Sequence, residues 1–141
     1  MVADKIIDFL DRPIAFHRLF VTITGSISAA LMLSQALYWS KKTTDPDGWF
    51  YKTMLEWEEE TALSEEEQAT ARKKLRKSGF WVEERRGLPA KLFFKINLSE
   101  FRLAIFNCKN SESSFRESRK QYSGNHGIYI QRLLQRLLQR I

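Results

Sequence analysis

The sequence predicts an α+β fold, mainly α-helical, built around two short helices that a tight turn connects. Thr53 and Ser64 each stand three positions before a glutamate, a spacing at which side chains satisfy free N–H groups at a helix start. Only three residues separate the two helices, and Gly79 provides a stop for the second. Further along, residues 91–98 alternate between apolar and polar side chains, which predicts a strand.

Composition bounds the class of protein. The 141 residues allow one domain of ordinary size plus a tail, and 43% hydrophobic residues with ten Phe are enough for a core. The net charge is +6, but from Cys108 onward seven Lys or Arg face two Asp or Glu, so residues 1–107 are almost neutral. A nucleic-acid interpretation therefore needs a local basic patch. Cys108 is the single cysteine, which excludes an internal disulfide and fits a reducing cytoplasm.

The first elements lie in an apolar stretch. Residues 1–12 form a mixed-charge N-terminal segment without the features of a secretory signal. Residues 13–23, rich in β-branched and aromatic side chains, predict a strand or an extended lead-in. Residues 19–39 carry no charge, but polar residues and Gly25 interrupt them, so we expect no membrane partner. A buried helix starting near Ser26 is favoured, with its buried stripe formed by Ile27, Ala30, Leu31, Ser34, Leu37 and Tyr38.

The helix pair lies between predicted strands. Residues 45–48 predict a turn, and the aromatic residues 49–51 a short strand. After the helix pair, residues 80–86 and 91–98 flank a Gly/Pro turn and predict a β-hairpin. Ser99 is expected to cap a closing helix that runs to Asn107. This order of elements is that of a winged helix-turn-helix with a C-terminal β-hairpin wing, expected over residues 13–107.

Four segments stand in this order along the chain: LSQALYW (33–39), DGWFYKT (47–53), TALSEEEQATARKKLRKSGF (61–80) and GLPAKLFFKIN (87–97). They resemble the winged-helix domain of phage- and plasmid-type replication proteins, which is similar to the amino-terminal domain of DnaD-like primosome proteins. The resemblance covers roughly residues 13–101. It implies a bacterial or mobile-element source and work at a replication origin. It is more specific for fold than for function, because winged helices also serve transcription regulators and protein contacts.

The second helix, residues 64–78, is the candidate recognition helix. At about 100° per residue, Gln68, Ala71 and Leu75 face the core, and a basic face lies opposite. Its cations can meet successive phosphates, and Thr70 can approach a base edge. The hairpin adds cations beside its turn that can reach the backbone or a minor groove. The nucleic-acid-binding candidates are Thr53, Thr70, Arg72, Lys73, Lys74, Arg76, Lys77, Arg85, Arg86 and Lys91. The alternative is a solvated basic face and an ordinary polar hairpin tip.

Acidic residues argue against DNA contact at the start of this helix. Residues 65–67 are three glutamates at the end that usually enters the major groove, and residues 58–60 are three more. Carboxylates in a first turn also stabilise the helix dipole, and such an acidic rim suits a protein-docking surface equally well. The aromatic residues Trp49, Tyr51, Trp57, Trp81 and Phe93 are expected in the core or the sheet rather than as stacking platforms for bases.

No catalytic pattern is present in the sequence. It has no phosphate-binding glycine loop and no nucleophile elbow, and His17, His126 and Cys108 lack metal-ligand spacing, so we expect no enzyme activity, cofactor or metal. Residues 108–141 are predicted to be a basic linker followed by an amphipathic or disordered tail. Residues 130–141 repeat apolar positions at helical spacing, as in a partner helix, a self-association seam or a membrane-surface helix. A second hypothesis is that the tail is a frame-shifted version of a polar Thr/Glu tract.

Together these patterns predict a cytoplasmic protein that binds DNA, with double-stranded DNA as the expected partner. The predicted role is replication initiation, or a primosome-type accessory function of a phage, plasmid or integrated mobile element. A homodimer or a replication protein is the expected protein partner. The alternatives are a winged helix for protein–protein interaction and a transcriptional regulator.

Overall fold

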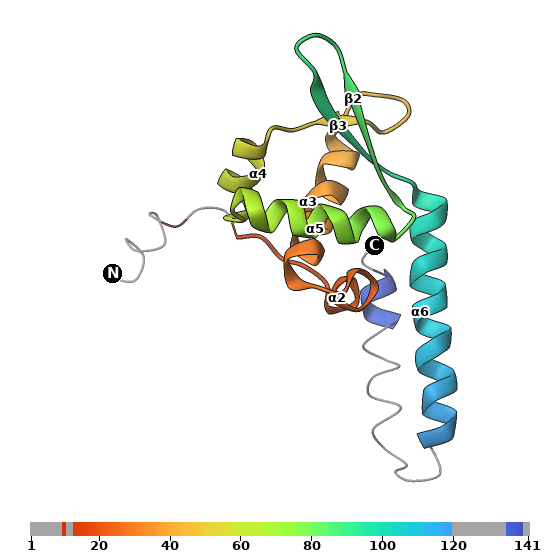
Figure 1. Ribbon diagram of the computed structural model, residues 1–141. Coiled ribbons are helices and arrows are strands. Elements are labelled where there is room, and N and C mark those ends of the chain that lie inside the picture. Colours follow the sequence, from red (N-terminus) through yellow and green to blue (C-terminus); the bar gives the residue numbers. More distant parts are fainter. Residues whose placement is uncertain (1–9, 11–12, 120–134, 140–141) are drawn as a thin grey trace, which may run out of the picture.

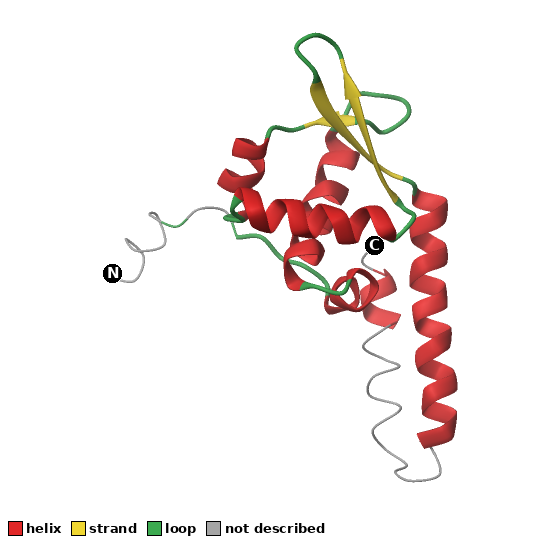
Figure 2. Ribbon diagram, in the orientation of Figure 1, coloured by secondary structure: helices red, strands yellow, loops and turns green. Residues whose placement is uncertain are grey.

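The chain folds as a mostly helical α+β domain with one small sheet (Figure 1). The computed structural model describes residues 10, 13–119 and 135–139. The elements in order are α2 (Arg18–Thr24), α3 (Ile27–Lys42), β1 (Phe50–Tyr51), α4 (Met54–Thr61), α5 (Glu65–Lys77), β2 (Trp81–Arg86), β3 (Lys91–Ile96) and α6 (Leu98–Arg119). The strands lie at one end of the molecule and the helices fill the rest (Figure 2). The predicted α+β, mainly helical class is confirmed.

The pair α4–α5 begins at the two predicted caps. The Thr53 hydroxyl accepts from the Glu56 backbone N–H at 3.1 Å. Ser64 and Glu67 form the full reciprocal box, with both bonds at 3.2 Å. The turn between the helices needs a left-handed residue, which is Ala62 at φ 61°. The two helices, their N-cap residues and the short turn are therefore confirmed; the capping box is complete at α5, whereas α4 is capped by the Thr53 hydroxyl.

The sheet has the strand order β1-β3-β2 and is antiparallel throughout. The predicted hairpin is confirmed, with Trp81 opposite Ile96 at its base and Arg86 opposite Lys91 beside the turn. Strand β1 adds to the free edge of β3 through two residues, of which Phe50 pairs with Phe94. Period-two alternation therefore gives this sheet one face toward the helices and one outer face.

An aromatic core joins the sheet to the helices. Trp57 of α4 packs edge-on against Phe94 of β3, with ring centroids 5.4 Å apart, and Trp81 lies 5.5 Å from the same ring. Below them Phe101 of α6 contacts Phe20 of α2 at 5.6 Å. These five side chains are all buried. The sequence pattern places Trp57 and Trp81 in the core or the sheet, and this expectation is confirmed.

Two expectations for the first helices are wrong. Residues 18–24 form helix α2 instead of a strand, because packing of Leu19 and Phe20 into the core outweighs the weak β preference of branched side chains. Helix α3 does begin after Ser26, which caps it, but the predicted stripe is only partly right: Ala30 is buried, and Leu31 and Leu37 pack partly buried against the core. Ile27 is 63% exposed. The residues that are buried are Ala29, Ala30, Met32, Leu33 and Ala36. Because apolar residues lie almost all round α3, the spacing of its apolar residues does not indicate which side of the helix is buried.

The closing helix is longer than expected and has a different cap. The Asn97 side chain, not Ser99, accepts from the Glu100 N–H at 3.2 Å. Leu98, predicted in the strand, instead starts α6 and is 54% exposed. The helix continues to Arg119, so residues 110–119 are helical and the linker prediction is wrong there. Ile105 and Phe101 anchor the first half of α6 in the core, which explains why it continues the fold directly.

The remaining expectations concern the tail and a membrane. Of the predicted tail helix, residues 135–139 are described and helical, and Leu137 and Leu138 pack partly buried against the core. The rest of 130–141 lies outside the described residues, and the frame-shift hypothesis stays a prediction. Within the described chain, no single helix has the length and apolar character to span a bilayer. Helices α2 and α3 pass that test only as a pair bent by 113°.

Candidate nucleic-acid interface

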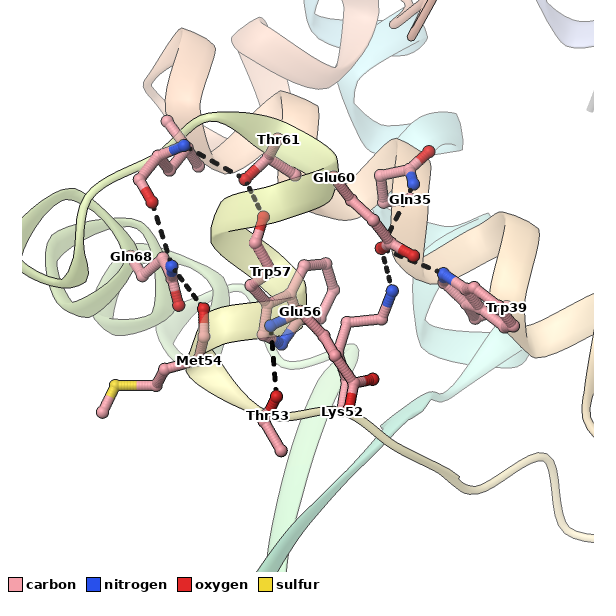
Figure 3. Close-up of polar contacts among 11 residues, drawn as sticks. Gln35, Trp39, Lys52, Thr53, Met54, Glu56, Trp57, Glu60, Thr61 and Gln68 are labelled. Carbon is pink, nitrogen blue, oxygen red and sulfur yellow. Dashed lines mark hydrogen bonds and ion pairs between the residues drawn. The ribbon is translucent and has the colours of Figure 1, made fainter. Parts of the chain in front are cut away.

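Helix α5 buries one side and presents the other to solvent. Gln68, Ala71 and Leu75 are buried, as the spacing predicted. The Gln68 amide donates at 3.0 Å to the Met54 and to the Leu63 carbonyl oxygen, which holds α5 against α4 and the turn (Figure 3). The orientation of α5 is thereby fixed, and side chains on its opposite side, among them Lys73 and Lys77, are exposed.

Two of the predicted contact arginines form ion pairs within the protein, Arg72 in a poorly exposed position and Arg76 with its side chain 48% exposed. Arg72 donates to both oxygens of Glu83 on β2, at 2.9 and 2.7 Å, in a bidentate pair. Arg76 reaches the same carboxylate at 3.2 Å, and the Trp81 indole N–H donates to it at 2.9 Å. Because the Arg72 and Glu83 side chains are only 17% and 9% exposed, this cluster joins α5 to the hairpin and Arg72 is poorly placed for phosphate contact.

The electrostatics of Glu83 follow from this cluster. Burial alone would raise the pKa of its carboxyl. Hydrogen bonds from Arg72 and Trp81, together with the charges of Arg72 and Arg76, outweigh burial and hold the pKa below its usual value of 4.5. Glu83 is therefore ionised near neutral pH. The cluster of Glu83, Arg72 and Arg76 has one positive charge in excess.

Three lysines of α5 remain available to a ligand. Lys73, Lys74 and Lys77 are exposed, and none forms an ion pair among the residues that the structure describes. Lys73 and Lys77 lie one helical turn apart on the side away from the core. Thr70 is exposed on the preceding turn, and its hydroxyl donates to the Glu66 carbonyl at 3.1 Å, so it can still accept.

The hairpin divides its cations between two faces. Arg85 lies two residues from Glu83, so it shares the face of β2 that contacts α5, and it is exposed. Arg86 and Lys91 lie opposite each other on the outer face. There Arg86 pairs with Glu84 at 3.0 Å. The predicted hairpin cations therefore do not form one group: only Arg85 lies on the side of α5.

The acidic rim is smaller than the sequence suggested. Glu60 points inward and accepts from Trp39 at 3.2 Å and Gln35 at 3.4 Å, and it pairs with Lys52 (Figure 3). Glu67 is engaged in the capping box. Glu65 and Glu66 remain exposed at the start of α5, and so do Glu58 and Glu59 on α4. The exposed acids therefore lie on α4 and at the amino end of α5, and the lysines occupy the carboxyl half of α5.

Lys52 is a buried cation that the sequence pattern did not single out. It is 3% exposed, and its ammonium lies 4.3 Å from the Trp39 ring centroid and 4.9 Å from that of Trp57. Burial lowers its pKa to about 8, against the opposing negative charge of Glu56. Lys52 lies between the aromatic residues of a predicted strand and the cap of a predicted helix. No hydrophobic periodicity covers that position, so the sequence pattern did not predict that it is buried.

The final predicted residue, Thr53, caps α4 with its hydroxyl and is half-buried. Its function in the structure is local, and contact with a ligand stays a prediction.

Among the described residues, no group of three or more His, Cys, Asp or Glu side chains is arranged to hold a metal ion. Comparison of the chain with protein families, with curated proteins and with solved structures finds no match.

Proposed function

We propose that this protein binds double-stranded DNA as a winged helix, with α5 as the recognition helix and the β2–β3 hairpin as the wing. The observation that carries the proposal is the pair Lys73 and Lys77, exposed and without ion pairs among the described residues, on the solvent side of a helix that follows a capped tight turn. A helix with this placement is the element that such domains lay into the major groove. A role in replication initiation or as a primosome accessory rests on the resemblance of its four segments to replication proteins.

The distribution of charge favours contact through the carboxyl half of α5. Lys73, Lys77 and Arg85 meet the phosphate backbone, and Glu65 and Glu66 keep the amino end away from it. Arg72 and Arg76 act mainly by fixing the hairpin to α5 through Glu83. Thr70 is the side chain placed to approach a base edge. Such binding depends mostly on phosphate contacts and is strongly salt-dependent.

The test is a salt series of duplex binding by the 141-residue chain. Removing one lysine–phosphate interaction lowers the slope of log affinity against log salt by roughly 0.9, so Lys73→Ala with Lys77→Ala lowers it by roughly 2. The double variant weakens binding to all duplex sequences alike. Thr70→Ala changes sequence preference with a smaller reduction in affinity.

The matched control is Arg102→Ala with Lys109→Ala, which removes the same charge from α6. This control keeps the natural salt slope, because neither residue lies on α5 or the hairpin. Equal affinity and equal slope for the natural chain and the Lys73/Lys77 variant would exclude this face of α5 as a DNA site.

Self-association is a second candidate function, favoured by exposed apolar residues on α6. Leu103 and Phe106 lie three positions apart on one side of the helix and are 52% and 58% exposed. Sedimentation equilibrium tests it: Leu103→Ser with Phe106→Ser converts a dimer to a monomer if this face is the interface. A natural chain that is monomeric at high concentration would exclude it.

A further inference from the structure

Aromatic rings gather on the outer face of the sheet, where polar side chains would be expected. Tyr51 of β1 and Phe93 of β3 are paired in register, and their ring centroids lie 5.6 Å apart at 40°. Trp49 directly precedes β1. Tyr51 is 39% exposed, and Trp49 and Phe93 are partly exposed. Phe94, the next residue of β3, is buried on the opposite face. The three outer rings are therefore not part of the core.

Cations surround these rings. The Arg86 guanidinium lies 4.8 Å from the centroids of both Trp49 and Phe93. The Lys91 ammonium lies 5.2 Å from the Tyr51 ring, and that of Lys95 lies 5.7 Å from Trp49. The facing acids are Glu84, which pairs with Arg86, and Asp45, whose carboxylate accepts from the Trp49 backbone N–H at 3.0 Å. Positive charge therefore exceeds negative charge around the rings.

The same rings line an open hollow of about 640 Å³. The sheet supplies one wall, and the end of α3 with the loop that follows it supplies the other, through residues that include Lys42 and Pro46. The Lys42 ammonium lies 5.5 Å from the Tyr38 ring and adds another cation at this rim.

We propose that this outer face binds single-stranded nucleic acid, with bases stacked on Tyr51 and Phe93 and phosphates at Lys91 and Lys95. Stacking on aromatic side chains beside cations is the chemistry by which proteins hold single strands without reading their sequence. The Arg86 guanidinium is planar and can itself carry a base. A duplex cannot bind here in this way, because its base faces are stacked inside the helix. The proposal is independent of duplex binding by α5, which lies on the other side of the sheet.

The experiment compares three fluorescent probes of equal length with the full chain: oligothymidine of about 15 nucleotides, an abasic strand with the same phosphates, and a duplex. The natural chain binds oligothymidine more tightly than the abasic strand, because only the former can stack. The variant Tyr51→Leu with Phe93→Leu keeps apolar volume but removes both rings. It weakens oligothymidine binding by at least roughly 5- to 150-fold, the range for loss of a single stacking ring, and leaves duplex binding unchanged.

Circular dichroism and thermal unfolding establish that the variant is folded. The single variant Tyr51→Phe, which keeps both rings, retains most of the affinity. The proposal is overturned if the natural chain binds no oligothymidine, if it binds the abasic strand equally well, or if the folded double variant keeps full affinity. It is also overturned if Lys73→Ala with Lys77→Ala abolishes oligothymidine binding, since single strands would then use α5. Absence of duplex binding by the natural chain, with stacking-dependent oligothymidine binding retained, refutes the function of α5 and leaves this inference standing.

Discussion

At the scale of single residues, the buried Lys52 shows how neighbouring aromatic rings stabilise a buried positive charge. Its ammonium pairs with Glu60 and faces two indole rings, so the charge has partners although water is excluded. Burial still makes the charged form of Lys52 less favourable in the folded chain than in the unfolded chain, where the ammonium is hydrated. A pH-dependent contribution to stability follows from this difference.

We predict that the natural chain gains stability relative to Lys52→Met as the pH rises from about 8 to 10.5. The folded-state pKa is about 8 and the ordinary value is 10.5, so in this window the unfolded chain binds the extra proton. The free energy of unfolding therefore increases with pH in this window. Urea unfolding of both chains at a series of pH values measures the difference. Lys41→Met, an exposed neighbour, is the control and shows no such trend. A difference that is flat or falls with pH would contradict the assignment.

At the scale of elements, Glu83 decides how the hairpin sits on α5. Its carboxylate accepts hydrogen bonds from two arginines of the helix and from the indole N–H of Trp81 on its own strand. An ion pair this poorly exposed depends on all its partners, so removal of the acid leaves Arg72 without one. Its neighbour Glu84 pairs with Arg86 at the surface and is 50% exposed.

We predict that Glu83→Gln lowers the free energy of unfolding by about 1–3 kcal/mol, because Arg72 loses a charged acceptor in a poorly solvated place. Since the folded-state pKa of Glu83 is depressed, its contribution is present above pH 4.5 and is lost as the pH falls further. The two chains therefore converge in stability in acid. Glu84→Gln is the matched control and changes stability by less than about 1 kcal/mol. A constant gap between natural chain and Glu83→Gln from neutral to acidic pH would refute the assignment.

Helix α5 also depends on its apolar anchor. Leu75 is fully buried, with 0% exposure. Leu75→Ala leaves a cavity and costs roughly 2–5 kcal/mol of stability by denaturant unfolding, whereas the exposed neighbour variant Lys74→Ala stays within about 0.5 kcal/mol. At temperatures where it is still folded, Leu75→Ala keeps the natural salt slope of duplex binding. A changed slope in the folded variant would mean that α5 has moved.

At the scale of the whole molecule, the sequence predicts local elements better than their faces. The capping residues Thr53 and Ser64 and the hairpin alternation fix α4, α5, β2 and β3, because those signals act within a few residues. The buried side of α3 was not predictable, since only contacts with other helices choose among its apolar residues. The same is true of the candidate site: spacing predicted that Lys73 is exposed, but the pairing of Arg72 with Glu83 joins residues from two elements and leaves no periodic signal.

The β2–β3 hairpin separates the two proposed surfaces. Arg85 of β2 is exposed on the side of α5, and Phe93 of β3 lies on the outer face beside Tyr51. The hairpin is a single layer of strands. A DNA molecule that contacts both of its sides would therefore be double-stranded on the side of α5 and single-stranded on the other. The hairpin would then lie at the junction of a forked DNA, between its double-stranded and single-stranded arms. A forked oligonucleotide should therefore bind more tightly than either of its arms alone, by an amount set by how rigidly the two arms are tethered.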